Sequence, residues 1–250
     1  MKIVITGATG YIGNHLVKVA IRQGYDVISM SRRQSEYHKL SWIKYDLFAS
    51  SPVSIPSGTI ALIHLAANTG KEQDLDNDLE LRAVRLLLSA AKKRGAKFIF
   101  VSSQTARPDA PTSYGSTKWS IEQEVLAARE FVVRPGQVYG GSERGLFGSL
   151  VKVVKKSPFL PGFFPAPKIQ PIHIDDFAEG LIAIVKNNVI KSRVLCLASP
   201  TPIKFSCFML AIAKERVRRW RLLVPIPILL VNGIVSLLGK RLSSRLGFLK

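Results

Sequence analysis

The stretch at residues 6–13, TGATGYIG, constrains the fold of this chain more than any other feature. An apolar, β-branched run at residues 2–5 precedes it, and from Tyr11 the apolar residues recur with a helical period. Its glycines, placed between a strand and a helix, allow a tight turn, a close approach to a pyrophosphate and close packing of the helix on the sheet. The sequence therefore predicts a dinucleotide-binding strand, turn and helix. The expected cofactor contacts are Gly7, Thr9, Gly10, Tyr11, Ile12 and Gly13.

Strand-like and helix-like segments alternate after this turn. Further strands are expected at residues 25–30, 59–67, 96–103 and 129–136, and helices at residues 78–95 and 116–128. The alternation predicts an α/β fold with a doubly wound parallel sheet, and the continuous apolar strands indicate that helices cover both faces. We expect an NAD(P)-binding Rossmann domain over residues 1–140.

The pattern changes after Gly140, where Gly and Pro become frequent. The expected elements are loops at residues 140–149 and 157–171, a helix at 174–187 and a strand at 193–199. We expect a small C-terminal substrate lobe over residues 141–250, in which residues 170–200 return to the Rossmann sheet.

The chain is strongly basic, with 36 Lys and Arg against 17 Asp and Glu and a formal net charge of +19. From residue 180 onward, 13 Lys and Arg stand against the single acid Glu215. Such a field suits an anionic small substrate, an anionic membrane surface or nucleic acid. No RNA-binding or DNA-binding motif accompanies the charge, so we expect no nucleic-acid partner.

Residues 222–239 carry no charge and approach the length of a membrane span. Pro225 and Pro227, with Asn232 and Gly233, interrupt the stretch, which favours a packed segment with an amphipathic helix over a span. The basic C-terminal segment 214–250 is the candidate for peripheral membrane association.

The two cysteines, Cys196 and Cys207, lack the spacing of a zinc site or a redox motif. We expect both to be reduced side chains in the core, with no disulfide and no metal. The short apolar run after Lys2 ends in glycines and does not resemble a signal peptide. These features predict a cytoplasmic protein, with the membrane surface as the alternative location.

The end of the second strand decides which dinucleotide fits. An NAD-selective site needs a carboxylate there for the ribose 2′-hydroxyl, whereas a 2′-phosphate needs cations. The chain has Ser31, Arg32 and Arg33 at this point, so NADP(H) is the expected cofactor and NAD(H) the alternative. Arg32 would bind the phosphate and Ser31 would donate a hydrogen bond, unless the arginines are only solvated loop charges. Asp46 follows the next strand, where it would accept from the adenine amino group, with Leu47 beside it.

Tyr114 and Lys118 stand one helical turn apart at the start of a predicted helix. On one helix face, the lysine charge would favour the tyrosinate and lower the phenol pKa. A phenol with a lowered pKa is a proton donor and acceptor that is usable near neutral pH. A surface Tyr and Lys on an amphipathic helix is the alternative interpretation.

Six motifs follow one another in a recognisable order along the chain. They are TGATGYIG at 6–13, HLAA at 64–67, VSS at 101–103, YGSTK at 114–118, RPGQVYG at 134–140 and PIHIDDFA at 171–178. With these motifs the sequence resembles the extended short-chain dehydrogenases/reductases of the NAD-dependent epimerase/dehydratase family. The resemblance implies an enzyme that oxidises or reduces a secondary alcohol or ketone by hydride transfer, and a homodimer, which is usual in that family.

The resemblance implies a role for each matching residue. Tyr114 would be the general acid/base, Lys118 would hold the nicotinamide ribose and lower the phenol pKa, and Ser103 would hydrogen-bond the substrate oxygen. A buried structural hydroxyl is the alternative for Ser103, given its neighbour Ser102. Further cofactor contacts are expected from Leu65, Ala66, Ala67, Tyr114, Pro135 and Gly136, and the weak substrate candidates are Gln137 and Arg144.

Several positions depart from the family pattern. Gln104, Thr105 and Ala106 replace the usual residues after the serine. Gln137 stands where many nucleotide-sugar epimerases have asparagine, and Glu80 replaces a helix asparagine. The sequence favours an NADP(H)-dependent epimerase or oxidoreductase acting on a nucleotide-activated sugar. The alternatives are a carbonyl or aldehyde reductase, and a non-catalytic NADP(H)-binding module that docks on a membrane or a larger complex.

Overall fold

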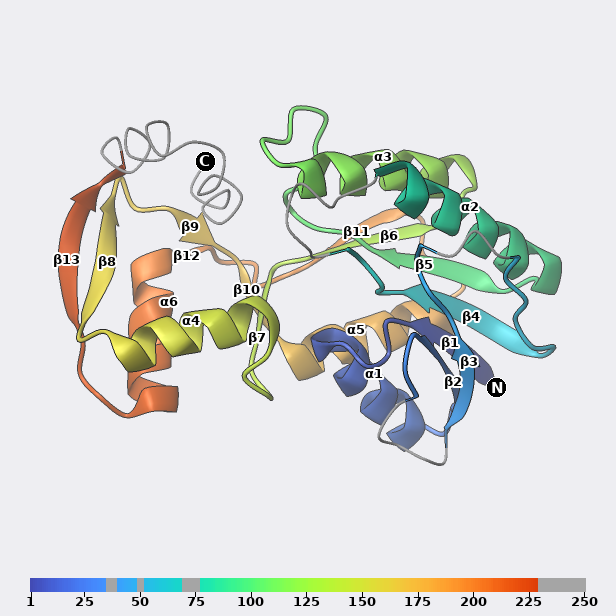
Figure 1. Cartoon of the computed structure of the whole chain (residues 1–250), viewed down its shortest axis with the longest axis horizontal. Helices are drawn as coiled ribbons and strands as arrows, with labels where there is room; N and C mark the ends of the chain where they lie inside the picture. The colour runs from blue at the N-terminus through green and yellow to red at the C-terminus, as the bar shows by residue number, and fades with distance from the viewer. Residues whose placement is uncertain (35–39, 49–51, 69–76, 229–250) are drawn as a thin grey trace. The chain divides into compact units, whose positions relative to one another are not determined.

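The computed structural model describes residues 1–34, 40–48, 52–68 and 77–228 (Figure 1). The chain divides into two compact units, each described by itself. Unit 1 comprises Met1–Pro135 and Ile174–Leu197, and unit 2 comprises Gly136–His173 and the described residues from Ala198 onward.

Unit 1 is built on a seven-stranded sheet in which every neighbouring pair of strands is parallel. The strands in spatial order are β11 (Val194–Leu197), β6 (Phe131–Pro135), β5 (Lys97–Val101), β4 (Thr59–His64), β1 (Lys2–Thr6), β2 (Asp26–Ser31) and β3 (Ser41–Lys44). The order reverses direction between β1 and β4, and in such sheets ligands bind at the carboxyl ends of the strands near this point.

Four helices cover the sheet of unit 1 (Figure 1). They are α1 (Tyr11–Arg22), α2 (Asn77–Arg94), α3 (Ser113–Ala127) and α5 (Ile174–Lys186). Helices α1 and α5 pack together on one face, and α2 and α3 pack together on the other. The central strands are buried, as the continuous apolar runs predict. The predicted doubly wound parallel α/β fold is confirmed.

Unit 2 contains three two-stranded sheets and three helical segments. Strand β7 (Gln137–Tyr139) pairs with β10 (Pro171–His173), β8 (Phe159–Phe164) with β13 (Leu222–Pro227), and β9 (Lys168–Ile169) with β12 (Ile203–Lys204). The helical segments are α4 (Gly145–Lys156), α6 (Phe205–Ala211) and the π-helical η2 (Ile212–Val217).

The prediction of loops at residues 140–149 and 157–171 is wrong in part, because α4 begins inside the first segment and β8 and β9 lie in the second. Proline breaks a central strand because it has no N–H for the ladder, but it is tolerated on an edge strand. Among the described residues, β8 pairs with β13 and with no other strand, so Pro161 fits there. The predicted packed helix within 222–239 is also wrong where it is described, since β13 is extended and largely exposed. Residues 229–239 lie outside the described residues.

The prediction that both cysteines are core residues is wrong. Cys196 lies on the edge strand β11, and Cys207 lies in the first turn of α6, and both are exposed free thiols. Their apolar neighbours in the sequence do not imply burial, because an edge strand and a surface helix each turn one side toward solvent.

Candidate active site

The glycine turn brings backbone from two strands into close contact. Gly7 has a φ of 67°, a left-handed conformation that glycine adopts without strain. A Cβ at this position would lie 2.8 Å from the Ala66 backbone nitrogen, and a Cβ at Gly13 would overlap the Gly7 carbonyl oxygen and lie 2.8 Å from the Ala8 Cα. The predicted tight turn and close helix packing are therefore present. This side-chain-free backbone, followed at once by the N-terminus of α1, fits a dinucleotide pyrophosphate.

Thr6 and His64 hold the loop after β4 against the end of β1. The Thr6 hydroxyl oxygen accepts hydrogen bonds from the Leu65 and Ala66 amides at 3.1 and 3.2 Å and lies 2.7 Å from His64 Nδ1. Because both acceptor positions of the hydroxyl are used, its proton goes to Nδ1, and the imidazole is neutral. Burial, with a smaller effect of the Lys118 charge, lowers the pKa of His64 to about 3. The HLAA motif was a signal in the sequence, but no role was predicted for either Thr6 or His64.

The end of β2 differs in part from the expectation. Arg32 and Arg33 directly follow the strand and are exposed, as phosphate-binding cations would be. Ser31 is buried, its hydroxyl donates to the Arg33 carbonyl oxygen at 2.6 Å, and the hydroxyl oxygen accepts from Trp42 Nε1 at 3.2 Å. Ser31 therefore uses its proton inside the turn, and its predicted role as a donor to the phosphate is wrong for this conformation.

Asp46 and Leu47 follow β3 and are placed differently. The Asp46 carboxylate accepts from the Phe48 amide at 3.2 Å and is partly accessible, so it remains a candidate for the adenine amino group. The Leu47 side chain is buried in the main hydrophobic cluster. Its side chain is part of the hydrophobic core, so only the Leu47 backbone could contact a cofactor directly.

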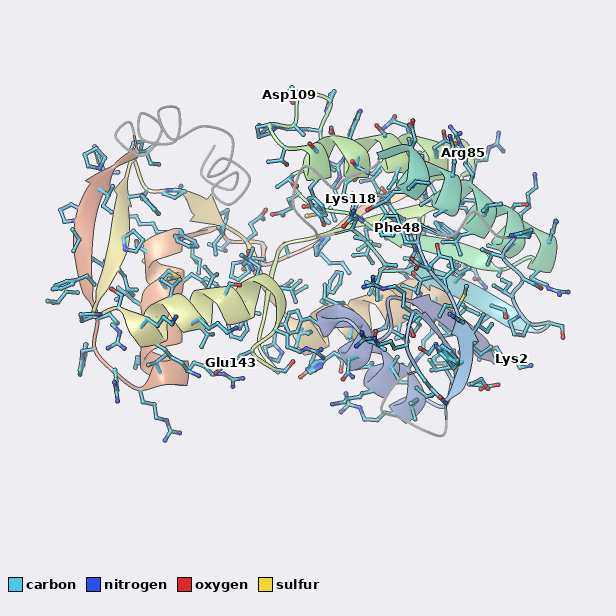
Figure 2. All side chains as sticks on the ribbon, in the orientation of Figure 1. Lys2, Phe48, Arg85, Asp109, Lys118 and Glu143 are labelled. Carbon is cyan, nitrogen blue, oxygen red and sulfur yellow. The ribbon has the colours of Figure 1, made fainter. Side chains whose placement is uncertain are left out.

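Tyr114 and Lys118 come from the first turns of α3, whose N-cap Thr112 accepts from the Gly115 amide at 3.2 Å. Lys118 is 2% exposed and points toward the sheet (Figure 2). Its Nζ donates to the Val101 carbonyl oxygen at 3.5 Å and lies 5.7 Å from the centre of the Tyr114 ring. The two side chains therefore share a helix face, as the spacing predicts, and the alternative of a solvated surface pair does not hold for Lys118.

The pKa of the Tyr114 phenol differs from the expectation. Burial, together with the negative charge of Glu80, raises it to about 12. Burial also lowers the pKa of Lys118, against the opposing charges of Glu80 and Glu122. The expected lowering of the phenol pKa is therefore wrong for the free protein, because loss of solvation exceeds the effect of the lysine charge. Tyr114 is protonated at neutral pH and is ready to donate a proton.

Glu80, which the sequence marked as a departure from the family, is a buried carboxylate of α2. Its Oε1 accepts a hydrogen bond from the Asn68 amide at 2.6 Å. The bond fixes the chain just after the HLAA motif. The carboxylate also brings a negative charge close enough to act on both Tyr114 and Lys118.

The two serines after β5 divide the expected roles between them. Ser102 is buried, and its hydroxyl donates to Glu122 Oε1 at 2.5 Å. Ser103 is partly exposed, and its Oγ lies 2.9 Å from Thr105 Oγ1. The Thr105 carbonyl oxygen lies 2.8 Å from where a Gly115 Cβ would be, so this loop packs on the first turn of α3. Ser102 is therefore the structural hydroxyl, and Ser103 is the more accessible one, in the loop that packs on the first turn of α3.

An ion pair between the buried Glu122 and the partly exposed Arg134, which the sequence did not reveal, supports this arrangement. Glu122 is 0% exposed and accepts from Arg134 Nε at 2.8 Å and from Arg134 Nη2 at 2.5 Å. The pair joins α3 to β6, and the Ser102 hydrogen bond extends it to β5. It therefore fixes the helix that carries Tyr114 and Lys118 to the sheet.

The remaining predicted residues fall in both units. Leu65, Ala66 and Ala67 follow β4 and are partly buried, and Pro135 ends β6, all in unit 1. Gly136, Gln137 and Arg144 belong to unit 2. Gln137 Nε2 donates to the Val138 carbonyl oxygen at 3.3 Å, and Arg144 is an exposed residue that precedes α4. Their cofactor and substrate contacts stay predictions.

Residues 3–196 match the family described as the NAD dependent epimerase/dehydratase family. A ceramide reductase of Caulobacter vibrioides is 29% identical over 75% of the chain, which spans 62% of that protein's length. The mitochondrial NADH dehydrogenase [ubiquinone] 1 alpha subcomplex subunit 9 of Dictyostelium discoideum is 23% identical over 96% of the chain and 70% of the subunit. A UDP-glucose 4-epimerase of Vibrio cholerae is 26% identical over 90% of the chain and 79% of the epimerase.

Among solved structures, the UDP-N-acetylglucosamine 4-epimerase from Bacillus cereus is similar to the chain. The TM-score is 0.72 at 16% sequence identity, and the match covers 91% of this chain and 85% of the epimerase. At this identity the likeness supports the fold, which agrees with the parallel sheet of unit 1.

Proposed function

Because the chain belongs to the NAD dependent epimerase/dehydratase family, we propose that it is an NADP(H)-dependent enzyme that acts on a secondary alcohol or ketone, with a nucleotide-activated sugar as substrate. The observation that carries the proposal is Lys118, buried at the carboxyl end of β5 with its charge 5.7 Å from the centre of the Tyr114 ring. A buried ammonium is costly, and a purely structural helix gains nothing from it.

Each polar side chain of the site has a distinct part in this chemistry. A bound nicotinamide supplies or takes up the hydride. Tyr114, protonated at neutral pH, donates its proton to the substrate oxygen in reduction and accepts one in oxidation. Ser103 offers an accessible hydroxyl to hydrogen-bond the same oxygen. Lys118 stabilises the negative charge that develops on the phenol as the proton leaves.

The choice of NADP(H) rests on the end of β2. Arg32 and Arg33 are exposed there, and the first residues after the strand include no carboxylate to repel a 2′-phosphate. The choice of a nucleotide sugar rests on the likeness to the UDP-glucose 4-epimerase of Vibrio cholerae and on the basic character of the chain.

The likeness to ceramide reductase favours a second candidate, a net ketone reductase on the same residues. The two differ in cofactor use, because an epimerase returns the hydride to its substrate and a reductase consumes one NADPH for each turnover. A third candidate, a non-catalytic NADP(H)-binding module of a larger complex, is favoured by the likeness to the mitochondrial subunit over nearly the whole chain.

The test combines cofactor titration with substrate screening. We expect NADPH to bind more tightly than NADH to the wild type, and Arg32→Ala with Arg33→Ala to remove the preference. The exposed pair Lys92→Ala and Lys93→Ala is the matched control, because it removes the same charge elsewhere on unit 1. Turnover of a UDP- or GDP-sugar with unchanged NADP(H) supports the epimerase, stoichiometric NADPH loss supports the reductase, and tight binding without turnover on sugars or ketones contradicts both.

A further inference from the structure

Unit 2 exposes three large apolar side chains at one end of the β8–β13 pair. Phe159 is 55% exposed, Leu222 is 67% exposed and Trp220 is 97% exposed. Strand β13 pairs only with β8 among the described residues, and α6 packs beside β8 (Figure 1). A tryptophan left almost entirely in water beside other apolar side chains is unusual and marks an interaction surface.

The strand register brings Phe159 and Leu222 together, and Trp220 is near them in the sequence. Leu222 stands opposite Phe159 in the strand register, and its amide donates to the Pro158 carbonyl oxygen at 3.0 Å. Trp220 precedes this pair by two residues. The turn that carries it is fastened by the neighbouring Arg221, whose guanidinium donates to the Val154 carbonyl oxygen at 2.8 Å.

A second Arg221 donor reaches the Lys155 carbonyl oxygen at 3.4 Å. Both acceptors belong to the last turn of α4, where carbonyl groups have no partner within the helix. Arg221 therefore uses its charge to anchor the turn. Trp220 is therefore exposed on a turn that hydrogen bonds hold in place.

Three exposed cations border the apolar group, namely Lys156 at the end of α4 and Arg218 and Arg219 in the turn. Over its described residues, unit 2 has only two acids, Glu143 and Glu215. Glu143 lies 2.7 Å from Lys155 Nζ, and Glu215 lies 3.7 Å from Lys214 Nζ. Both carboxylates therefore face other cations, and the charge beside Trp220 is left for an outside anion.

We propose that Phe159, Trp220 and Leu222, with Lys156, Arg218 and Arg219, form a docking surface for an anionic lipid bilayer. An amphipathic indole and two apolar side chains suit the headgroup region, while the cations bind anionic headgroups. The described residues contain no helix long and apolar enough to cross a membrane, so the contact is interfacial. A second copy of the chain would present the same positive charge and be repelled, and a nucleic acid would leave Phe159 and Leu222 in water.

The sequence analysis named all of residues 214–250 as the candidate for membrane association, whereas the proposed surface uses only Arg218, Arg219, Trp220 and Leu222 of that segment. It includes Lys156 and Phe159 from α4 and β8, which the sequence did not implicate, and it needs nothing from residues 229–250, which lie outside the described residues. It is also independent of the proposed activity, because none of its residues is placed in the active site.

The test is co-sedimentation of the full chain with vesicles of phosphatidylcholine alone or mixed with phosphatidylglycerol, read together with tryptophan fluorescence. We expect binding to the anionic vesicles, weakened by salt, with a blue shift in emission that Trp220→Ser removes. Reversing Arg218→Glu with Arg219→Glu should lower the partition coefficient by at least about thirtyfold, since each cation near an anionic surface contributes roughly a factor of five. The control Lys92→Glu with Lys93→Glu changes the net charge equally on unit 1 and should have a much smaller effect.

Several results would overturn the proposal. Equal binding to neutral and anionic vesicles would show that the cations play no part. Equal losses of vesicle binding for the two charge reversals would show that only the net charge of the chain matters. Binding unaffected by Trp220→Ser with Leu222→Ser, in variants whose circular dichroism and melting match the wild type, would place the contact elsewhere. A fall in oligomer mass for the same variants, without vesicle binding by the wild type, would make the surface a contact between copies.

Discussion

The two units treat charge in opposite ways. Unit 1 buries Lys118, Glu80 and Glu122 and gives each a specific partner or an opposing charge, whereas unit 2 leaves Arg218 and Arg219 in solvent beside exposed apolar side chains. Burying a charge is costly and is retained where it fixes or performs chemistry. The difference agrees with the two proposals, an active site that draws its polar side chains from unit 1 and a docking surface on unit 2.

The Glu122 carboxylate should be the most important charge for stability. Glu122→Ala leaves Arg134 and the Ser102 hydroxyl without their partner, and we expect unfolding free energy to fall by about 3–5 kcal/mol. Denaturant unfolding with cofactor absent measures it. Glu124→Ala in the same helix is the control, because it breaks an exposed pair with Arg85 and should cost no more than about 1 kcal/mol. Equal losses would contradict the distinction between buried and exposed charge.

His64 should make unit 1 sensitive to acid. Its pKa is lowered to about 3 in the folded state from an ordinary 6.5, so between these values the unfolded state binds more protons. The contribution of His64 to the free energy of unfolding is therefore fully present above pH 6.5. It decreases as the pH falls toward 3, by roughly 3–5 kcal/mol in all. Denaturant unfolding across this range measures the slope. His64→Asn, which keeps an acceptor for Thr6 but does not titrate, should flatten it, and an unchanged slope would assign the effect to other groups.

Gly7→Ala should damage the cofactor turn. Its φ of 67° and the close Ala66 nitrogen leave no room for a Cβ, so we expect a loss of about 1–3 kcal/mol in stability and a marked loss of NADP(H) affinity. Gly58→Ala has a φ of 73° with open space around the added atom, so it should cost only the backbone strain and leave affinity unchanged. Calorimetric titration distinguishes the two. Equal affinity in both variants would show that the turn does not hold the cofactor.

Glu80→Gln should have the smallest effect and the most specific readout. Its carboxylate raises the pKa of Tyr114, so the neutral amide should move the alkaline limb of the pH–rate profile to lower pH. The amide keeps an oxygen for the Asn68 hydrogen bond, and stability should change little. Asp78→Asn, earlier in the same helix, is the control. A profile that shifts equally in both, or in neither, would contradict the role given to Glu80.

Much of unit 1 could be predicted from the sequence. The alternating apolar segments predicted the parallel sheet, the glycines of TGATGYIG predicted the tight turn at Gly7, and the four-residue spacing predicted the shared face of Tyr114 and Lys118, all from local signals. What the sequence could not supply depends on long-range contacts. Thr6 meets His64 across 58 positions, a contact with no local pattern. The direction of the Tyr114 pKa depends on burial in the same way.

Unit 2 was less predictable because its strands are short and its described sheets have only two strands each. Gly and Pro around Pro161 indicated loops, yet an edge strand tolerates them. Composition likewise placed Cys196 and Cys207 in a core, although β11 and α6 turn them to solvent. Ser31 was assigned from its position in the chain alone, and only the fold shows that the turn already uses its hydroxyl.

The central claim is that Tyr114 exchanges a proton with the substrate oxygen, and the most direct test is turnover by Tyr114→Phe. We expect the variant to bind NADPH like the wild type while kcat falls by about a hundredfold to ten-thousandfold, the range for a lost general acid/base. Tyr25→Phe is the control and should keep full activity, because Tyr25 precedes the amino end of β2, away from the carboxyl ends of the strands. Wild-type turnover in Tyr114→Phe would contradict the account and assign the proton to another group.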